Sequence, residues 1–252
     1  MKKLLLILLA LPMIGFGQVN IPDANFKAYL VGDNYINTNG DAEIQVSEAT
    51  AFNGAINCNS LNIFDLSAIE AFTALTSLDC SSNQLTSLDV SNNTDLTILR
   101  CSFNQLTSLD ISNCVFLEQI YAMYNQITIF NISQNSFLYH FTFSNNPVYC
   151  LNLANGNNLN FIDCNVFMTP FLYCIEVDDS LYVPGINTTD PQTYFSNNCN
   201  NSCSTTEIFE IHQIKKILKV KDLLGRETKG TKNEPLFYIY DDGTVEKRIV
   251  IE

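Results

Sequence analysis

The sequence offers few side chains of the kinds that carry out catalysis. Its two histidines, His140 and His212, are too far apart for the H-x-x-x-H or H-E-x-x-H spacing of zinc enzymes. A G-x-S-x-G nucleophile turn, a phosphate-binding glycine loop and a C-x-x-C metal pair are all missing from the body. A cysteine–histidine dyad would have to use His140, and the cysteines near it in register fall at core positions. We therefore predict that the protein is not an enzyme.

One loop carries oxygen atoms at metal-binding spacing. Residues 37–48 resemble the calcium loop of an EF-hand, with oxygen-bearing residues at positions 1, 3, 5, 9 and 12. The resemblance implies a calcium site, with Gln45 acting through water. The implied ligands are Asn37, Asn39, Asp41, the Glu43 carbonyl and Glu48. Two positions depart from the pattern, since position 1 is Asn and position 6 is Ala42 instead of Gly. The alternative is a polar turn of the same shape that holds no metal.

A period of 21 residues determines where most other side chains lie. The coil that starts at Leu75 has apolar residues at 75, 78, 80, 85, 88 and 90 and an asparagine at 83. The same pattern restarts at Leu96, Leu117 and Leu138, and we place a last coil at Leu159. An irregular unit around Ile56 precedes them at a spacing of 22.

Each unit reads L-x-x-L-x-L/C-x-x-N-x-L and so resembles the leucine-rich repeat. The alternating apolar residues at 78 and 80 predict a short strand with both side chains on one face. At the end of that strand, a column of buried amides can donate to and accept from unpaired backbone groups. This column is Asn83, Asn104, Asn125 and Asn146. We predict a β-rich solenoid with one short parallel strand per coil.

The outward face of the stacked strands is the predicted binding face. By register its rows are Ser77, Ile98, Gln119, His140 and Phe161; Asp79, Arg100, Tyr121, Thr142 and Asp163; and Ser81, Ser102, Met123, Ser144 and Asn165. We single out a cationic and aromatic cluster with two flanking residues, because Arg and Tyr often anchor interfaces. These residues are Arg100, Tyr121, His140, Phe161, Asp79 and Met123. The alternative is tolerated surface variation. We interpret the recurring aspartates as a solvated row, and they are Asp65, Asp79, Asp89 and Asp110.

The cysteines divide into two groups. Cys80, Cys101 and Cys164 occupy inward strand positions, where we expect small buried thiols instead of bridges between coils. Cys174 and Cys199 flank an irregular stretch after the last coil, and a bridge between them would close the end of the core. Cys203 competes as a partner.

Both ends of the chain carry targeting features. Residues 1–17 have two lysines, an apolar run too short to span a bilayer and a small-x-small site, as a secretory signal peptide does. The alternative is a retained N-terminal anchor. Residues 206–252 resemble the C-terminal sorting domain of the type IX secretion system of Bacteroidota, through the string 220–227 and the aromatic segment 238–247. That resemblance implies a small antiparallel β domain recognised by the type IX translocon. The alternative is an ordinary β appendage.

Between these ends we predict three further segments. Residues 18–53 form a helical N-terminal cap that holds the EF-hand-like loop, 54–179 form the repeats, and 180–205 form a C-terminal cap and linker. Lys27 and Arg100 are the only cations between Gln18 and Thr205, against 17 carboxylates, whereas the tail is neutral. A body this acidic repels phosphate backbones and excludes nucleic acid as a partner.

These features predict an exported binding or adhesion module, secreted or on the cell surface, without a transmembrane segment after signal cleavage. It would recognise a protein or glycan through its strand face. Two alternatives stay open at this point. One is a polysaccharide-active enzyme on a parallel β-helix, which would show three strands per coil and clustered Asp or Lys. The other is a passive structural protein without a specific ligand.

Overall fold

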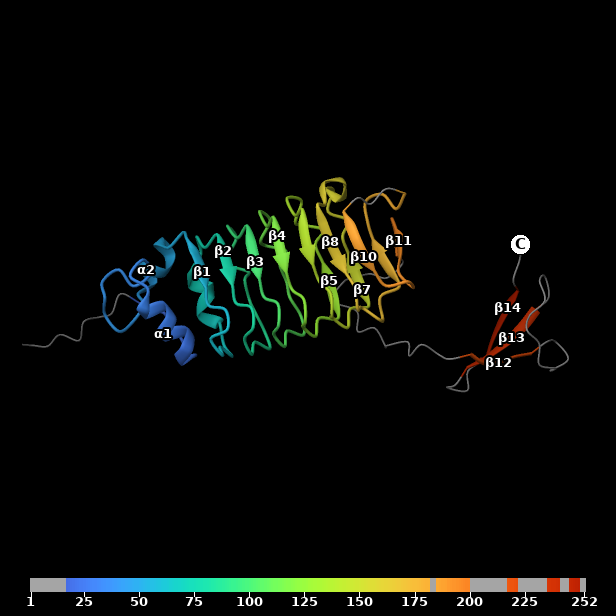
Figure 1. Ribbon diagram of the computed structural model, residues 1–252, viewed down its shortest axis with the longest axis horizontal. Helices are drawn as coiled ribbons and strands as arrows, with labels where there is room; N and C mark the ends of the chain where they lie inside the picture. The colour runs from blue at the N-terminus through green and yellow to red at the C-terminus, as the bar shows by residue number, and fades with distance from the viewer. Residues whose placement is uncertain (1–16, 182–184, 200–216, 222–234, 241–244, 250–252) are drawn as a thin grey trace, which may run out of the picture. The chain divides into compact units, whose positions relative to one another are not determined.

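The computed structural model describes residues 17–181, 185–199, 217–221, 235–240 and 245–249 (Figure 1). The chain divides into two compact units, Met1–Cys203 and Ser204–Glu252. The first unit is a solenoid with a helical N-terminal region, and the second contains a small sheet. The change in charge near Thr205 lies beside this division.

Two short helices begin the first unit. Helix α1 (Ala24–Gly32) starts where it does because the Asp23 carboxylate accepts hydrogen bonds from the N–H groups of Asn25 and Phe26. Helix α2 spans Val46–Ala51. The Tyr29 hydroxyl accepts a hydrogen bond from the N–H of Asn57 at 2.9 Å, so α1 satisfies part of the exposed edge of the first strand.

The main sheet, called here the front sheet, has seven parallel strands. They are β1 (Ala55–Asn57), β2 (Ser77–Asp79), β3 (Ile98–Arg100), β4 (Gln119–Tyr121), β6 (His140–Thr142), β8 (Asp163–Val166) and β10 (Ile186–Thr189). Leu78, Leu99, Ile120 and Phe141 are register partners on consecutive strands. The predicted solenoid with a period of about 21 residues is therefore confirmed.

A second parallel sheet, the back sheet, lines the opposite wall of the later coils. Its strands are β5 (Ile129–Asn131), β7 (Cys150–Asn152), β9 (Cys174–Glu176) and β11 (Tyr194–Ser196). The earlier coils have one described strand each, with a short 3-10 helix at Ser67–Ala71 in the first. The sequence did not predict the back sheet. Because β10 and β11 extend the two sheets, the stack continues beyond residue 179, where we placed its end.

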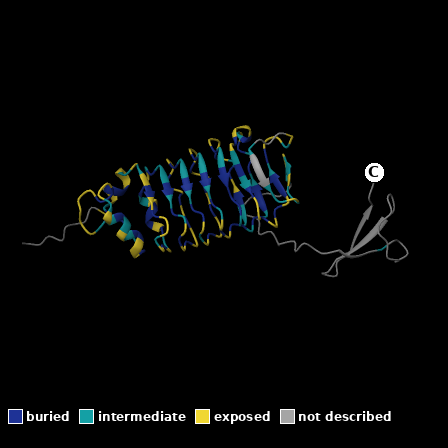
Figure 2. Ribbon diagram, viewed as in Figure 1, coloured by how far each residue is buried: buried dark blue, intermediate teal, exposed yellow. Residues whose placement is uncertain are grey.

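The core lies between the two walls (Figure 2). The central residue of each early front strand is buried and its two neighbours are partly exposed. Three buried rings from both walls stack in the middle coils. Phe130 lies 5.8 Å from Phe141 and 4.6 Å from Phe143, measured between ring centroids. This aromatic stack replaces the leucines and cysteines of earlier coils.

The asparagine column acts as predicted. The Asn125 amide nitrogen donates to the carbonyls of Cys101 and Ala122, and its oxygen accepts from the N–H of Leu106. Asn83 and Asn146 make equivalent bonds one or two coils away. Each amide therefore connects the backbone of its own coil to that of the preceding coil.

A second polar column lies on the other side of the coil, and we did not predict it. Asn93 donates to the carbonyls of Ile69 and Phe72, and Asn135 donates to those of Ile111 and Cys114. Cys114 takes the same position between them, and its thiol contacts the Val90 and Asn93 carbonyls. The spacing of 21 residues between Asn93, Cys114 and Asn135 could have indicated this column in the sequence.

The last predicted coil is out of register by two residues. His140 pairs with Asp163 and Phe141 pairs with Cys164, so this coil is 23 residues long. The added residues form a bend at Gly156 (φ 76°) and a 3-10 helix at Asn158–Asn160. Phe161 is consequently a core residue, only 4 % exposed, and the prediction that it lies on the binding face is wrong.

The shift moves other assignments in the same coil. Cys164 aligns with Phe141 and not with the Cys80 and Cys101 position. Thr169, which is fully buried, takes the place of the ladder asparagine that we had aligned with Phe167. Its N–H and hydroxyl both donate to the Asp190 carboxylate.

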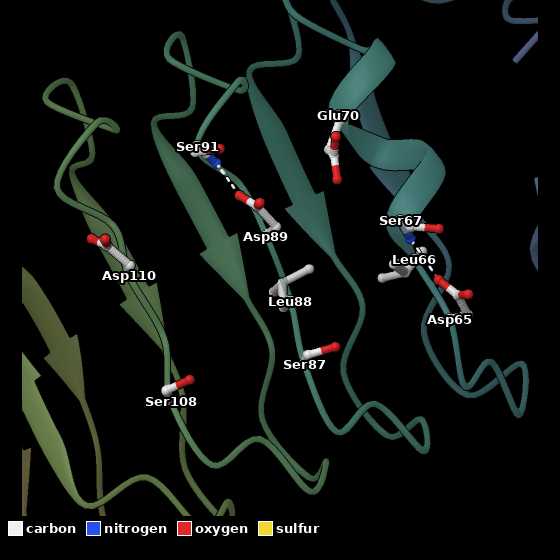
Figure 3. Close-up of a pocket in the computed structure, with 10 residues that line it drawn as sticks. All are labelled: Asp65, Leu66, Ser67, Glu70, Ser87, Leu88, Asp89, Ser91, Ser108 and Asp110. Atoms are coloured by element: carbon white, nitrogen blue, oxygen red, sulfur yellow. Dashed lines mark hydrogen bonds between the residues drawn. The ribbon is translucent and has the colours of Figure 1, made fainter. Parts of the chain in front are cut away.

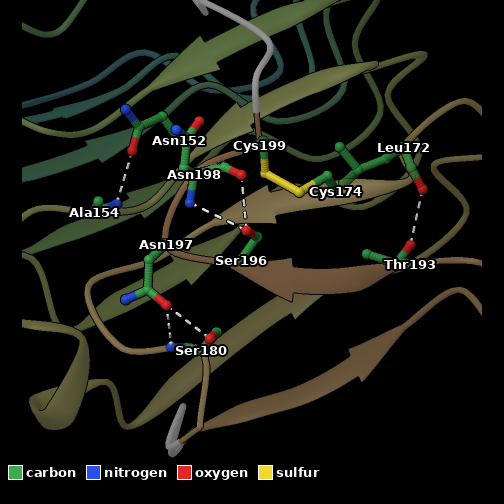
Figure 4. Close-up of a disulfide and its surroundings, with 10 residues drawn as sticks. All are labelled: Asn152, Ala154, Leu172, Cys174, Ser180, Thr193, Ser196, Asn197, Asn198 and Cys199. Atoms are coloured by element: carbon green, nitrogen blue, oxygen red, sulfur yellow. Dashed lines mark hydrogen bonds between the residues drawn. A yellow bond between two sulfur atoms is a disulfide. The ribbon is translucent and has the colours of Figure 1, made fainter.

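The cysteines follow the predicted division. Cys80, Cys101 and Cys164 are buried free thiols, as are Cys58 and Cys114. Burial raises the pKa of Cys58, Cys101 and Cys114 to about 12, so these thiols stay protonated and unreactive at neutral pH. Cys174, the first residue of β9, forms a disulfide with Cys199, and their Cα atoms lie 5.8 Å apart (Figure 4). Cys150 is disulfide-bonded as well, which we did not predict.

The second unit contains three antiparallel strands, β12 (Ile217–Lys221), β13 (Pro235–Tyr240) and β14 (Val245–Ile249). Residues 1–16 of the predicted signal peptide lie outside the described residues, as do residues 222–227 of the predicted sorting-domain string and residues 241–244. Among the residues described, no helix is long and apolar enough to cross a membrane.

Candidate binding face

The front sheet brings three of the predicted residues together. Arg100 and Tyr121 are register partners at the ends of β3 and β4. The guanidinium carbon lies 4.9 Å from the centre of the Tyr121 ring, within range of a cation–π interaction. The His140 ring, on β6, lies 4.7 Å from the same tyrosine ring at 34°. The result is a continuous cation–aromatic–imidazole cluster across three coils.

Hydrogen bonds orient this cluster. The Tyr121 hydroxyl donates to the Gln119 side-chain oxygen at 3.3 Å, and the Gln119 amide donates to the Tyr139 hydroxyl at 2.7 Å. On the far side, His140 Nε2 lies 3.7 Å from a carboxylate oxygen of Asp163. Asp163 takes the row position that we had assigned to Phe161. This row therefore has a carboxylate on β8 where we predicted an aromatic ring.

Two other predicted residues border the cluster. Asp79 is the register partner of Arg100 on β2, and its carboxylate accepts a hydrogen bond from the N–H of Ser81 at 3.0 Å. Met123 is partly exposed two residues after Tyr121, and its N–H donates to the Ser102 hydroxyl. The cluster thus lies among small polar neighbours, with Asp79 and Asp163 as the carboxylates of its rows.

The recurring aspartates do not form one row. Asp79 belongs to the front sheet, whereas Asp65, Asp89 and Asp110 line a groove of about 460 Å³ with Ser67 and other serines (Figure 3). These three accept hydrogen bonds from the N–H groups two residues further on. The Ser91 hydroxyl and N–H hold the pKa of Asp89 below its ordinary value. These contacts assign the carboxylates to turns, and the one described histidine, His140, is on the front sheet.

The EF-hand-like loop is held by hydrogen bonds between its own residues and by contacts with helix α1. The Asn37 side chain bonds the carbonyls of Val31 and Asp41 and the N–H of Gly40. The Asp41 carboxylate accepts from the Glu43 N–H and from the Gln45 amide. Elsewhere in the loop, Glu43 pairs with Lys27 at 2.7 Å, and the Asn39 oxygen accepts from the Asp41 N–H.

Glu48 is the centre of this network. One carboxylate oxygen accepts from the Thr38 N–H and hydroxyl and from the Asn39 N–H, and the other accepts from the Gln45 N–H. The bond to Gln45 completes a capping box for α2. Within the described residues, no group of three or more His, Cys, Asp or Glu side chains is placed to hold a metal ion. The side-chain oxygens of the loop accept hydrogen bonds from its own backbone, as in a turn that needs no metal. Calcium binding stays a prediction.

We expect Glu48→Gln to lower the free energy of unfolding by about 1–3 kcal/mol in neutral buffer with EDTA, since it weakens the hydrogen bonds of partly buried backbone donors. Burial alone would raise the pKa of Glu48, but the bonds from Gln45, Asn39 and Thr38 outweigh it and lower the pKa. The stabilisation is therefore complete above the unfolded-state pKa and is lost as the pH falls through the folded-state pKa. The deficit of the variant should shrink in acid.

Urea unfolding followed by circular dichroism measures this effect, with the exposed Glu70→Gln as the control. If Glu48→Gln is as stable as wild type in EDTA and less stable than wild type only when calcium is added, the hydrogen-bonded assignment of Glu48 is contradicted and the metal site is supported.

Comparisons with known proteins place the fold. The functional domain of InlJ from Listeria monocytogenes, described as including a cysteine ladder, is 26% identical with a TM-score of 0.53. The match covers 64% of this chain and 38% of that chain. The fold of the present chain is a leucine-rich-repeat solenoid. An internalin, InlF, from the same organism is 19% identical over 65% of this chain and 54% of that chain, with a TM-score of 0.45.

The chain thus spans about 38% and 54% of the lengths of these two proteins. No protein-family model matches the sequence, and the comparison with curated proteins gives no match. In this leucine-rich-repeat solenoid, a cysteine comes directly after each of the first three front strands, β1, β2 and β3. These cysteines are Cys58, Cys80 and Cys101.

Proposed function

We propose that this leucine-rich-repeat solenoid is an exported binding or adhesion module that recognises a protein or glycan through its front sheet. The observation that supports this most is the cluster of Arg100, Tyr121 and His140. Three neighbouring parallel strands present these side chains together, at positions that hold Ser77 and Asp79 on β2. Arg and Tyr are the residue types that dominate the energy of many interfaces.

The proposal includes export and no catalysis. Export rests on the signal-like segment 1–17 and on the resemblance of 206–252 to a type IX sorting domain, and both stay predictions. The alternative of a β-helix enzyme has less support. The front face contains the single basic residue Arg100, and the described aspartates of the groove are engaged in turns.

A protein and glycan array probed with the purified chain tests the proposed face. We expect Arg100→Ala/Tyr121→Ala to weaken binding by about 30-fold, the equivalent of about 2 kcal/mol for a central anchor. The matched control is Lys27→Ala/Tyr35→Ala, which removes one cation and one exposed tyrosine far along the sequence from the face. If the first variant keeps full binding to every protein and glycan that wild type binds, this face is excluded. A chain that binds nothing on the array supports a passive structural role.

A further inference from the structure

A second exposed cluster lies where the chain leaves the front sheet. The residue just before each ladder position has a positive φ in five coils, between 54° and 61°. These residues are Ser82, Phe103, Tyr124, Asn145 and Met168. Hydrogen bonds to the next coil fix the backbone there. The Phe103 N–H donates to the Met123 carbonyl, and the Tyr124 N–H donates to the Ser144 carbonyl. The coil therefore demands this conformation whatever the side chain is.

Aromatic residues are poor choices for such a position. Left-handed backbone favours Gly, Asn and Asp, and a bulky residue there is an outlier that calls for an explanation. Core packing does not supply one, because Phe103 is 50% exposed and Tyr124 is 47% exposed. Their rings stack on each other at 4.6 Å and 12°. Ser82 and Asn145 hold the neighbouring positions of this column with shorter polar side chains, and about half of the surface of Phe103 and of Tyr124 stays exposed.

Two exposed amides accompany the rings. Gln105 and Gln126 follow them by two residues, just after the ladder asparagines, and both are exposed. Within the described part of the chain their side chains make no hydrogen bond, while their backbone N–H groups are used in the stack. We call Phe103, Tyr124, Gln105 and Gln126 the aromatic ledge.

The ledge lies in a surface without charge. The segments 80–88, 101–109, 122–130 and 143–151, which run from the front strands to the back wall in four successive coils, contain no Asp, Glu, Lys or Arg. The rest of the body carries 17 carboxylates. A basic protein partner would be matched by carboxylates around the rings. An uncharged surface with open ring faces and free amides matches an uncharged ligand that has both C–H faces and hydroxyls.

We infer that the aromatic ledge binds neutral glycans. Sugar C–H faces pack on the electron-rich faces of Phe103 and Tyr124, and the Gln105 and Gln126 amides bond the sugar hydroxyls. This site is distinct from the Arg100–Tyr121–His140 cluster and does not require that cluster to bind anything.

Native gels that contain soluble neutral polysaccharides test the inference, because the acidic full-length chain migrates well in them. The probes are pullulan, galactomannan, hydroxyethyl cellulose and dextran. We expect at least one to retard wild type, and Phe103→Ser/Tyr124→Asn to weaken that binding by about tenfold or more. These substitutions install the residues that Ser82 and Asn145 already supply at the same backbone position, so the melting temperature should be unchanged or higher.

Two further variants complete the design. Phe116→Ser/Phe137→Ser removes another exposed ring pair, 6.0 Å apart, and should bind as wild type does. Arg100→Ala/Tyr121→Ala should also retain polysaccharide binding, which separates this site from the proposed face. Binding should persist in about 0.5 M NaCl, where exposed charges are screened. A wild-type chain that none of the four probes retards overturns the inference, even if it binds a protein, and so does equal loss in both ring-pair variants.

Discussion

Phe141→Ala should lower the free energy of unfolding by about 3–5 kcal/mol, the usual range for emptying a packed phenylalanine site. Phe141 is fully buried, and its ring lies 5.8 Å from Phe130 and 5.5 Å from Phe143. Phe130 belongs to the back wall, whereas Phe141 belongs to the front sheet, so the stack joins the two walls of the solenoid. Removing the Phe141 ring should leave a cavity that the two sheets cannot close without breaking their register.

The matched control is Phe137→Ala, four residues earlier in the same coil. Phe137 is 56% exposed, so its loss should cost within about 0.5 kcal/mol. Phe141→Leu should fall between the two, because it keeps part of the buried volume. Urea unfolding monitored by circular dichroism gives the three values. A cost for Phe141→Ala close to that for Phe137→Ala would mean that the walls collapse onto the gap, and that the aromatic stack does not set their spacing.

The middle coils could be predicted from the sequence because several constraints agree there. Leucines at 78 and 99 require one buried face, and asparagines at 83 and 104 require an unpaired backbone nearby. A shift of one residue would violate both requirements. The sequence therefore predicted the front register, and with it the contact of Arg100 with Tyr121 and the position of His140.

The last coil could not be predicted from the same pattern. Side chains in a strand alternate with a period of two, so a shift by two residues keeps the same faces inside. Leu159-x-x-Ile162-x-Cys164 and Phe161-x-x-Cys164-x-Val166 both satisfy the apolar spacing. Gly156 was the available signal, since its positive φ bends the chain where two residues are added. That ambiguity put Phe161 on the face when it belongs to the core.

The aromatic ledge could not be predicted because its key property is a backbone angle. Sequence periodicity shows which side chains share a column, but not that the column has a positive φ. Ser82 and Asn145 hinted at this conformation, because small polar residues tolerate it in turns. Without the angle, Phe103 and Tyr124 read as ordinary exposed residues between strand and ladder. The structure shows instead that they are strained, stacked and uncovered.

Asn125→Ala should lower the free energy of unfolding by about 3–5 kcal/mol, because it unpairs buried backbone groups in two coils at about 1–3 kcal/mol each. The lost bonds are those to the Cys101 and Ala122 carbonyls and from the Leu106 N–H. The control is Asn113→Ala, an exposed asparagine in the preceding coil with one bond to the Ser91 carbonyl, which should cost within about 0.5 kcal/mol.

The difference in unfolding free energy between these two variants shows what holds neighbouring coils together. Strand pairing supplies few hydrogen bonds per coil, since each early front strand is three residues long. If the amide ladder carries a large share of the coupling, Asn125→Ala should also broaden the urea transition, because the coils on either side would unfold less cooperatively. A small loss of unfolding free energy, with an unchanged dependence of that free energy on urea concentration, would mean that water replaces the amide. Apolar burial alone would then couple the coils. Thr169 argues for the first outcome, because where the asparagine is missing the Asp190 carboxylate from the next coil bonds its N–H and hydroxyl.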